Sequence, residues 1–196
     1  MRDATIKPQI EAQGLRLRDA QGQEHLLRFD RGGCHQLVLP QRQDVDALVC
    51  QLAALPQALV LPGDGGLLGI VPVRENIALA LRYHGQEFAG CETMIEEALA
   101  MCGYSGERGE ELAAELPIHL EPAERWLVGF VRALALRPAL LVASNAFAHL
   151  RSRLETEQVL RWAQLLRFYY PLRALFFIDQ DSHAVPALPG CVAIHC

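Results

Sequence analysis

The hydrophobic positions of this chain follow two periods, which predict helices alternating with strands. Between residues 126 and 135 apolar side chains recur every three or four positions, which predicts a helix with one buried face. Glu121-Pro122 predicts its start, because proline fits the first helical turn, and Arg137-Pro138 predicts its end. Residues 139–143 form a short apolar run, typical of a strand buried on both faces of a parallel sheet. A helix leading directly into such a strand indicates an α/β protein.

The same patterns predict the remaining elements. We expect strands at residues 10–18, 24–29, 34–39, 58–61, 174–178 and 191–195. Helices are expected over residues 93–102 and 106–116, and two more should begin at Asp44 and at Glu75-Asn76. A long helix should follow the capping box Ser152-Arg153-Leu154-Glu155 and end at Pro171. Residues 182–188 are expected to form a short helix or turn.

Composition narrows the class of protein. With 196 residues, 51% of them hydrophobic, the chain can bury a core as one domain. A net charge of −5 without a basic stripe argues against a nucleic-acid surface. No apolar run reaches the roughly 18–20 residues that span a bilayer, and the N-terminus lacks a signal-peptide core, so we expect a cytoplasmic protein. The six cysteines form no C-x-x-C pair and are interpreted as scattered reduced thiols, and no metal site is expected.

Two segments resemble one known family. Arg132-Ala133-Leu134 and Pro138 precede a hydrophobic strand, as in the signature-helix-to-Walker-B segment of ABC transporter ATPase domains. Residues 62–85 contain GGLL followed by VRENIALAL, and resemble the Q-loop segment of the same family. The ending Leu-Arg-Tyr-His-Gly is most similar to the ATPases of Mla/Mce-type lipid transporters. The resemblance covers roughly residues 9–195 and rests on the order and spacing of the segments.

The resemblance implies a fold and its subdivision. The fold class would be α/β: a P-loop NTPase-like, mostly parallel sheet flanked by helices, with an N-terminal antiparallel β-subdomain and a small α-helical subdomain. Residues 1–196 would form a single ABC-ATPase-like domain. Within it, residues 5–39 would hold the β-subdomain and first core strand, residues 40–73 and 117–196 the α/β core, and residues 74–116 the helical subdomain.

The Walker A positions depart from the family. The motif G-x-x-x-x-G-K-[ST] curls backbone N–H groups around phosphates and adds a lysine. Aligned on the flanking strand and helix, its second glycine falls on Asp44, its lysine on Val45 and its Ser/Thr on Asp46. Two like charges about 4 Å apart repel by about 4 kcal/mol at an effective dielectric of 20. Carboxylates at this position therefore disfavour a bound triphosphate.

The other catalytic positions are replaced as well. The Walker B aspartate position holds Ser144, and the catalytic glutamate position holds Asn145. The switch histidine is replaced by Gln180 and the Q-loop glutamine by Gly63. Residues 120–124 stand in place of the Leu-Ser-Gly-Gly-Gln signature. Phosphoryl transfer depends on positioning and on charge neutralisation by lysine and Mg²⁺, which these residues do not supply. We expect no ATPase activity and no cofactor.

Function is therefore expected to lie in binding partners. The resemblance implies a non-catalytic subunit that acts as scaffold or regulator of an ABC transporter, of the Mla/Mce lipid class, and meets the membrane only through that transporter. Its partners would be a permease, an intact ATPase subunit or a second copy in a dimer. The expected contact residues are Leu68, Val73, Arg74, Glu75, Asn76 and Tyr83.

Three alternatives remain open at this stage. A metal- or ligand-binding protein that reuses the fold would use the carboxylates that follow strands, Asp44, Asp46, Asp179 and Asp181. A free-standing homodimer unrelated to transport is the second. An enzyme with Ser144 or Cys34 as nucleophile is the third, although neither has a histidine at a telling spacing, and core positions are the preferred interpretation. The acidic residues Glu96, Glu97, Glu107, Glu110 and Glu111 are interpreted as a solvated face.

Overall fold

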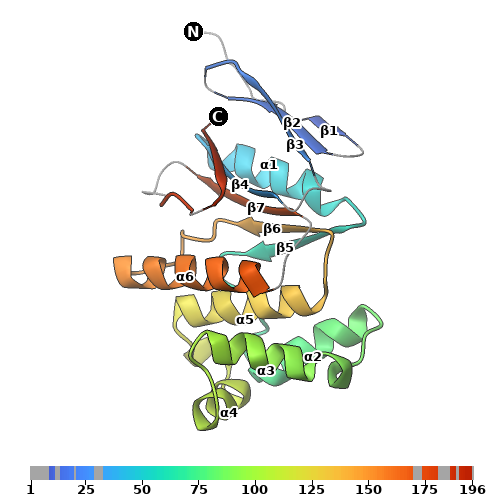
Figure 1. The fold of residues 1–196 in the computed structure, drawn as a ribbon, viewed down its shortest axis with the longest axis vertical. Helices are drawn as coiled ribbons and strands as arrows, with labels where there is room; N and C mark the ends of the chain where they lie inside the picture. Colours follow the sequence, from blue (N-terminus) through green and yellow to red (C-terminus); the bar gives the residue numbers. More distant parts are fainter. Residues whose placement is uncertain are drawn as a thin grey trace. The chain divides into compact units, whose positions relative to one another are not determined.

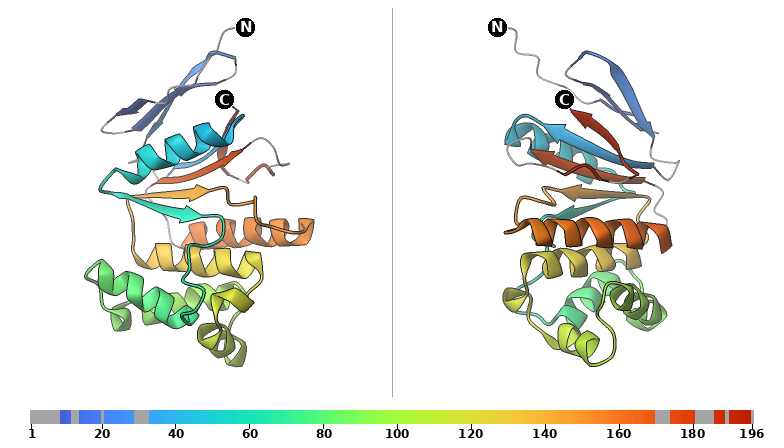
Figure 2. Two further views of the ribbon diagram at one scale, coloured as in Figure 1. Left: turned by 180° about the vertical axis from the view of Figure 1, so that it is seen from behind. Right: turned by 60° about the vertical axis from the view of Figure 1, so that its left-hand side comes forward.

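The structure is a computed structural model that describes residues 9–11, 14–19, 21–28, 33–169, 174–180, 186–188 and 190–195. The chain folds into two compact units, drawn in Figures 1 and 2. Unit 1 comprises Met1–Val60, Pro138–Ala148 and Leu172–Cys196, and unit 2 comprises Leu61–Arg137 and His149–Pro171. The subdomain boundaries expected from the sequence remain a prediction.

Unit 1 is built on a five-stranded sheet with the strand order β5-β6-β7-β4-β8. β4 pairs in parallel with β7 and β8, and β6 pairs in parallel with β7. The central strands β6 and β7 are almost continuously buried, as expected of a parallel sheet covered on both faces. This arrangement confirms the predicted fold class. The strands are β4 (Gly33–Leu39), β5 (Ala58–Pro62), β6 (Leu140–Ser144), β7 (Ala174–Gln180) and β8 (Val192–His195).

A second, antiparallel sheet precedes it, with β1 (Gln9–Glu11), β2 (Gly14–Arg18) and β3 (Glu24–Arg28) in sequential order. The prediction of one strand over residues 10–18 is wrong, because the chain reverses between Glu11 and Gly14, which are paired across β1 and β2. The turn after β2 is held by the Asp19 carboxylate, which accepts the N–H of Gln21 at 3.0 Å and of Gln23 at 2.8 Å. Such local bonds from an aspartate are typical of a tight turn.

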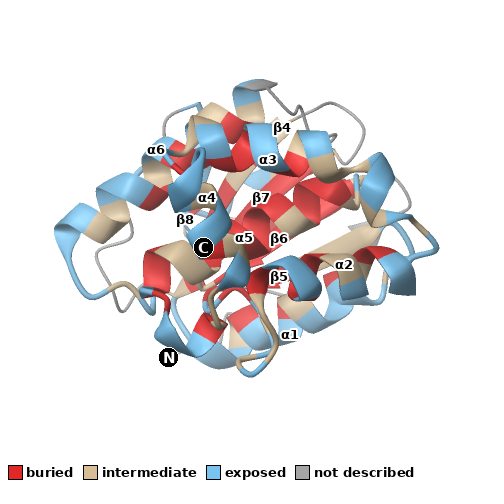
Figure 3. Cartoon of the chain, turned by 90° about the horizontal axis from the view of Figure 1, so that it is seen from below, coloured by how far each residue is buried: buried red, intermediate tan, exposed pale blue. Residues whose placement is uncertain are grey.

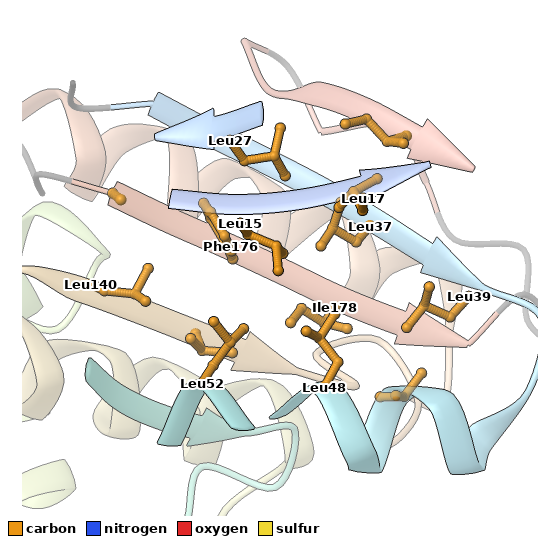
Figure 4. Packing of buried hydrophobic residues seen from close by; sticks show 14 residues of the cluster. Leu15, Leu17, Leu27, Leu37, Leu39, Leu48, Leu52, Leu140, Phe176 and Ile178 are labelled. Carbon is orange, nitrogen blue, oxygen red and sulfur yellow. The ribbon is translucent and has the colours of Figure 1, made fainter. Parts of the chain in front are cut away.

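One hydrophobic core joins the two sheets of unit 1 to the helix α1 (Arg42–Ala53). Figure 4 shows leucines of β2 and β3, alternate residues of β4, β6 and β7, and the buried stripe of α1 gathered in this core. Alternation places every second side chain of a strand on the same face. The core members are Leu15, Leu17, Leu27, Leu37, Leu39, Val45, Leu48, Leu52, Leu140, Val142, Ala174, Phe176, Ile178 and Ile194.

A disulfide bond between Cys34 and Cys191 corrects the expectation that the cysteines are all reduced. The two residues lie 157 positions apart in sequence, but β4 and β8 are neighbouring parallel strands, and their Cα atoms are 4.5 Å apart. That separation lies within the range a disulfide can bridge. Cys50, Cys91 and Cys102 are free, and Cys196 lies outside the described residues.

Unit 2 is helical, and α5 forms its centre. Eleven residues of α5 are buried, and Figure 3 shows this helix as mostly buried. It contacts α2, α3 and α6, and the rings of Trp126 and Phe130 stack within it at a centroid distance of 4.8 Å. The elements are α2 (Val73–Tyr83), η1 (Phe88–Gly90), α3 (Glu92–Met101), α4 (Glu107–Ala114), η2 (Pro117–His119), α5 (Pro122–Ala135) and α6 (Arg153–Tyr169).

The loop that follows β5 packs against the backbone of α5 through two glycines. A Cβ atom on Gly129 would lie 2.5 Å from the carbonyl oxygen of Gly65, and Gly65 itself has a φ of +84°. The guanidinium of Arg132 donates to the same oxygen at 3.0 Å. Only glycine permits so close an approach of two backbones. The loop at residues 63–66 is therefore fixed on α5.

The helices α2 and α6 start close to their predicted positions. α2 begins at Val73, two residues before Glu75, with Pro72 in the N-cap position. At the start of α6, the N–H of Glu155 donates to Ser152 Oγ at 3.2 Å, which confirms the predicted cap, whereas Tyr170 and Pro171 lie outside the described residues. Within the described ranges, no helix combines the length and apolarity needed to cross a bilayer.

Candidate functional site

The connection between β4 and α1, where the Walker A motif is expected, consists of two residues. β4 ends at Leu39 and α1 begins at Arg42, so only Pro40 and Gln41 lie between them. Gln41 is extended, with φ −124°, and its carbonyl oxygen accepts the N–H groups of Asp44 and Val45 at 3.1 and 3.3 Å. A phosphate cradle needs a longer run of backbone N–H groups curled around a concavity. Two residues, one of them a proline without an N–H, do not provide it.

The first turn of α1 also differs from the prediction in its cap. Asp44 was expected to cap the helix, but the N-cap residue is Gln41, and Asp44 lies in the first turn with a half-buried side chain. Val45, at the lysine position, is fully buried in the core of unit 1. Asp46 is exposed and lies 3.7 Å from the guanidinium of Arg42. The two carboxylates therefore remain at the helix start, one facing solvent and one partly covered.

The Walker B positions lie at the carboxyl end of β6. Ser144 is buried, and its hydroxyl accepts a hydrogen bond from the side-chain amide of Asn145 at 3.3 Å. Asn145 adopts a positive φ of 50°, a conformation that asparagine tolerates better than most residues, and its N–H donates to the carbonyl of Ile178 at 2.8 Å. Both Walker B positions are therefore uncharged, and the hydrogen bonds of Asn145 hold the turn that follows β6.

Asp179 is a buried carboxylate at the carboxyl end of β7, next to the switch position. Burial raises its pKa to about 7, opposed by hydrogen bonds from the N–H groups of Phe147 and Ala146. Its Oδ2 atom has no hydrogen-bond partner among the described residues. Val38 lies opposite Asp179 on β4, and Leu39 lies opposite Gln180. Ser144 pairs with Ile178, so Ser144 and Asn145 lie beside the end of β7, which carries Gln180 and Asp179. The burial of Asp179 was not predicted from the sequence.

Unit 2 holds the residues at the signature position, where two glutamates cap α5. The carboxylate of Glu121 accepts the N–H of Glu124, and the carboxylate of Glu124 accepts the N–H of Glu121 at 3.1 Å. Pro122, the first residue of the helix, has no N–H to offer. A helix N-terminus binds anions through free N–H groups and the helix dipole. At the start of α5, the carboxylates of Glu121 and Glu124 accept N–H groups of the chain and place negative charge at the positive end of the helix dipole.

The metal hypothesis finds no support in the described residues. Among them, no three His, Cys, Asp or Glu side chains lie close enough to hold one ion. Asp46 is exposed beside Arg42, Asp179 accepts backbone N–H groups, and Asp181 lies outside the described residues. The nucleophile hypothesis is also weakened, because the sulfur of Cys34 is in the disulfide.

The six predicted contact residues separate into exposed and buried groups. Leu68 and Tyr83 are 58% and 88% exposed, and Arg74 and Glu75 are also exposed. Val73 is buried in unit 2, and its role as a contact residue stays a prediction.

Asn76 is buried as well, and its role is to hold the preceding loop. Its side-chain oxygen accepts the N–H of Leu68 at 2.7 Å, and its side-chain nitrogen donates to the carbonyls of Val71 and Leu68 at 2.6 and 3.1 Å. The expectation that Asn76 contacts a partner stays a prediction, and the structure shows its side chain bonded to the loop before α2.

Sequence reasoning missed the reciprocal cap of α5 and the burial of Asp179. The sequence signal of the reciprocal cap was the spacing of Glu121 and Glu124, three positions apart. Only Pro122 was used to predict the start of the helix. Asp179 was noted as a strand-end carboxylate, whereas its burial depends on the loop after β6, which the sequence does not place beside it.

Comparison with known proteins extends only to the fold. No protein-family model matches the sequence, and no curated protein matches it. Among solved structures, cbiO1 from Clostridium perfringens, described as part of the ABC transporter complex cbiONQ, matches with a TM-score of 0.65 and 11% sequence identity. The match covers 87% of this chain and 80% of that chain. The chain therefore has the α/β fold of an ABC transporter ATPase domain.

Proposed function

We propose that this protein is a non-catalytic ABC-ATPase-like subunit that acts as a scaffold or regulator of an ABC transporter, of the Mla/Mce lipid class. It would work in the cytoplasm and reach the membrane through the transporter. Its partners would be the permease, an intact ATPase subunit or both.

The two-residue connection between Leu39 and Arg42 is the observation that carries the proposal. The other groups of a nucleotide site act on phosphates that the Walker A loop and its lysine hold in place. The connection between Leu39 and Arg42 provides neither that loop nor that lysine. Val45, at the lysine position, points into the core and contributes to stability. Restoring a single catalytic residue would not restore the cradle.

The second support is the anion-repelling start of α5. Glu121 and Glu124 occupy the end of the helix that would have to face a phosphate. Two independent helix starts, α1 at the Walker A position and α5 at the signature position, thus carry carboxylates. A protein that keeps the fold and fills both places with acids is better suited to binding proteins than to binding ATP.

The outer face of α2 and the loop before it supply a surface for a partner. Leu79 and Tyr83 are exposed and lie one turn apart on α2, and Leu68 and Ile70 are exposed in the loop, Ile70 by 86%. Exposed apolar side chains that gather on one segment mark interaction surfaces more often than isolated ones do. We name Leu68, Ile70, Leu79 and Tyr83 the α2 surface.

Co-purification tests the proposal. The tagged protein should recover a permease or an intact ATPase under mild conditions, and Leu68→Asp with Tyr83→Asp should abolish that recovery. Leu154→Asp is the matched control, because Leu154 is 76% exposed on α6, outside the α2 surface. Recovery of the protein alone, or as a homodimer by light scattering, would contradict the transporter role.

A further inference from the structure

β8 lies at one edge of the parallel sheet and buries little of its own surface. Among the described strands it is the last in the sheet order, and it pairs in parallel with β4 over the positions from Val192 to His195 (Figure 2). Of its four described side chains, only that of Ile194 is buried, and Val192 is 57% exposed. Burial of apolar surface is the main force that holds an element in a fold. β8 therefore depends on contacts outside its own ladder.

Two side chains of β4 hold the segment that leads into β8. The sulfur of Cys34 is bonded to that of Cys191, the residue directly before β8. The side-chain nitrogen of Gln36 donates to the carbonyl of Pro186 at 2.9 Å, and its side-chain oxygen accepts the N–H of Leu188 at 3.2 Å. Because side chains alternate along a strand, Cys34 and Gln36 lie on the same face of β4. Both tethers therefore act from the same side of one strand.

We name residues 186–188 and 190–195 the latch segment. Its buried side chains are Leu188 and Ile194. The two hydrogen bonds of Gln36 add little, because water replaces the partners of a hydrogen bond when a segment moves away. The disulfide is the only covalent contact between the latch segment and β4 among the described residues. It is therefore the contact that decides whether the segment stays on β4.

We propose that the disulfide between Cys34 and Cys191 is a redox-controlled latch on the β4 edge of the sheet. In the oxidised protein the latch segment is held on β4. In the reduced protein it opens while the rest of unit 1 stays folded, and the backbone groups of β4 that paired with β8 become accessible. The proposal goes beyond the transporter role and does not depend on it, because all of its contacts lie within unit 1.

Opening is a thiol–disulfide exchange, with a small thiol such as glutathione as the reductant. Cys34 is 4% exposed and Cys191 is partly exposed, so the thiolate of the reductant attacks the sulfur of Cys191. The bond between the two protein sulfurs breaks, and the sulfur of Cys34 leaves as a thiolate and takes up a proton. A second thiolate then attacks the glutathione sulfur of the mixed disulfide and displaces Cys191, which is also protonated.

The balance of this exchange makes the latch reversible. The protein gains two electrons and two protons, and two molecules of glutathione become one molecule of glutathione disulfide. Glutathione disulfide drives the reaction in the opposite direction and closes the latch. The ratio of the two forms of glutathione therefore sets the fraction of closed protein.

Hydrogen exchange of the full chain tests the latch. Fully oxidised and fully reduced protein are compared, with the redox state verified by alkylation of the thiols and mass measurement. On reduction, the amides of the latch segment should exchange at least about tenfold faster, because local opening exposes them to water. In the reduced protein this exchange should not change with urea below the unfolding transition, whereas exchange of β6 should rise with urea, since a small local opening exposes little surface.

Three kinds of variant isolate the disulfide. Cys191→Ser should exchange like the reduced wild type, with or without reductant. Cys50→Ser, at an exposed free cysteine, is the matched control and should keep the full redox response, as should Cys196→Ser, which removes the other cysteine near the end of the chain. Gln36→Leu removes the two hydrogen bonds, so its latch segment should exchange faster than that of the wild type when reduced and stay slow when oxidised.

Two results would overturn the proposal. The first is exchange of the latch segment in the reduced protein that equals the oxidised rate or rises with urea as steeply as that of β6, because the segment would then stay on β4 until the whole protein unfolds. The second is the recovery of all six cysteines as alkylated thiols after incubation with glutathione disulfide, because no latch would then form.

Discussion

The backbone N–H of Glu121 donates to the carboxylate of Glu124 at 3.1 Å, and the N–H of Glu124 donates back to the carboxylate of Glu121. This reciprocal cap satisfies two of the donors that a helix start leaves unpaired and places two negative charges at the positive end of the α5 dipole. The same contacts that stabilise unit 2 therefore remove a site where an anion would otherwise bind.

Replacing Glu121 by alanine should destabilise the protein by about 1 kcal/mol, because the cap of α5 is lost. The exposed pair between Glu121 and Arg151, at 3.3 Å, adds little to this value. Urea unfolding measures the effect. Glu157→Ala, which removes an exposed pair with Arg153 on α6, is the control and should change the free energy of unfolding by less than about 0.5 kcal/mol.

The stability of the protein should fall as the pH rises toward neutrality, because of Asp179. Its pKa is about 7 in the folded state against an ordinary value of 3.8, so the folded state binds the proton more tightly than the unfolded chain does. The stabilisation is complete below pH 3.8 and is lost as the pH rises through about 7. The slope from this one group is at most about 1.4 kcal/mol per pH unit.

Asp179→Asn provides the measurement for this effect. The amide oxygen can still accept the N–H groups of Ala146 and Phe147, while the charge is absent. The variant should therefore be nearly equal to the wild type below pH 3.8 and increasingly more stable than it as the pH rises toward 7, by at least about 1 kcal/mol at pH 8. His35, whose pKa is lowered by burial, is present in both proteins and cancels in the comparison. Parallel pH profiles for the two proteins would contradict the assignment.

Gly129→Ala should destabilise the protein, although alanine is normally the better helix residue. The added Cβ would lie 2.5 Å from the carbonyl oxygen of Gly65, and a forced shift in a packed interior costs about 1–3 kcal/mol. Gly90→Ala is the control, since nothing lies within 4 Å of its Cβ position. A melting temperature for Gly129→Ala equal to or above that of the wild type would show that the loop does not rest on α5.

Cys191→Ser should lower stability by about 2–4 kcal/mol, because it opens a loop of 157 residues. Cys50→Ser, at an exposed free cysteine, should have little effect. Thiol titration of the denatured chain gives a second measurement. Reduction should release two additional thiols, and an unchanged count after isolation from a reducing cytoplasm would show that the bond does not form there.

Much of the fold was predictable because it depends on local pattern. The spacing of Trp126, Phe130 and Leu134 predicts α5, and the apolar run at residues 174–178 predicts β7, whose observed bounds are Ala174–Gln180. The N-cap of α1 was misplaced by three residues, at Asp44 instead of Gln41, because aspartate has a strong capping propensity. Gln41 takes the cap position instead, although its side chain makes no cap hydrogen bond, so the helix begins without the local signal that the sequence offered.

The site was less predictable, because its decisive features join distant segments. Cys34 and Cys191 become neighbours only when β8 pairs with β4, and the N–H groups that Asp179 accepts come from the loop after β6. Asn76 is buried against the loop before α2, to which its side chain bonds, and hydrophobic periodicity does not predict where that loop lies.

Calorimetric titration of the purified chain with ATP and Mg²⁺ tests the central claim most directly. The account predicts no saturable binding up to about 1 mM nucleotide, a concentration that corresponds to about −4 kcal/mol. Binding at one site that saturates below that concentration, requires Mg²⁺ and is weakened by a substitution at Gln41 would contradict it.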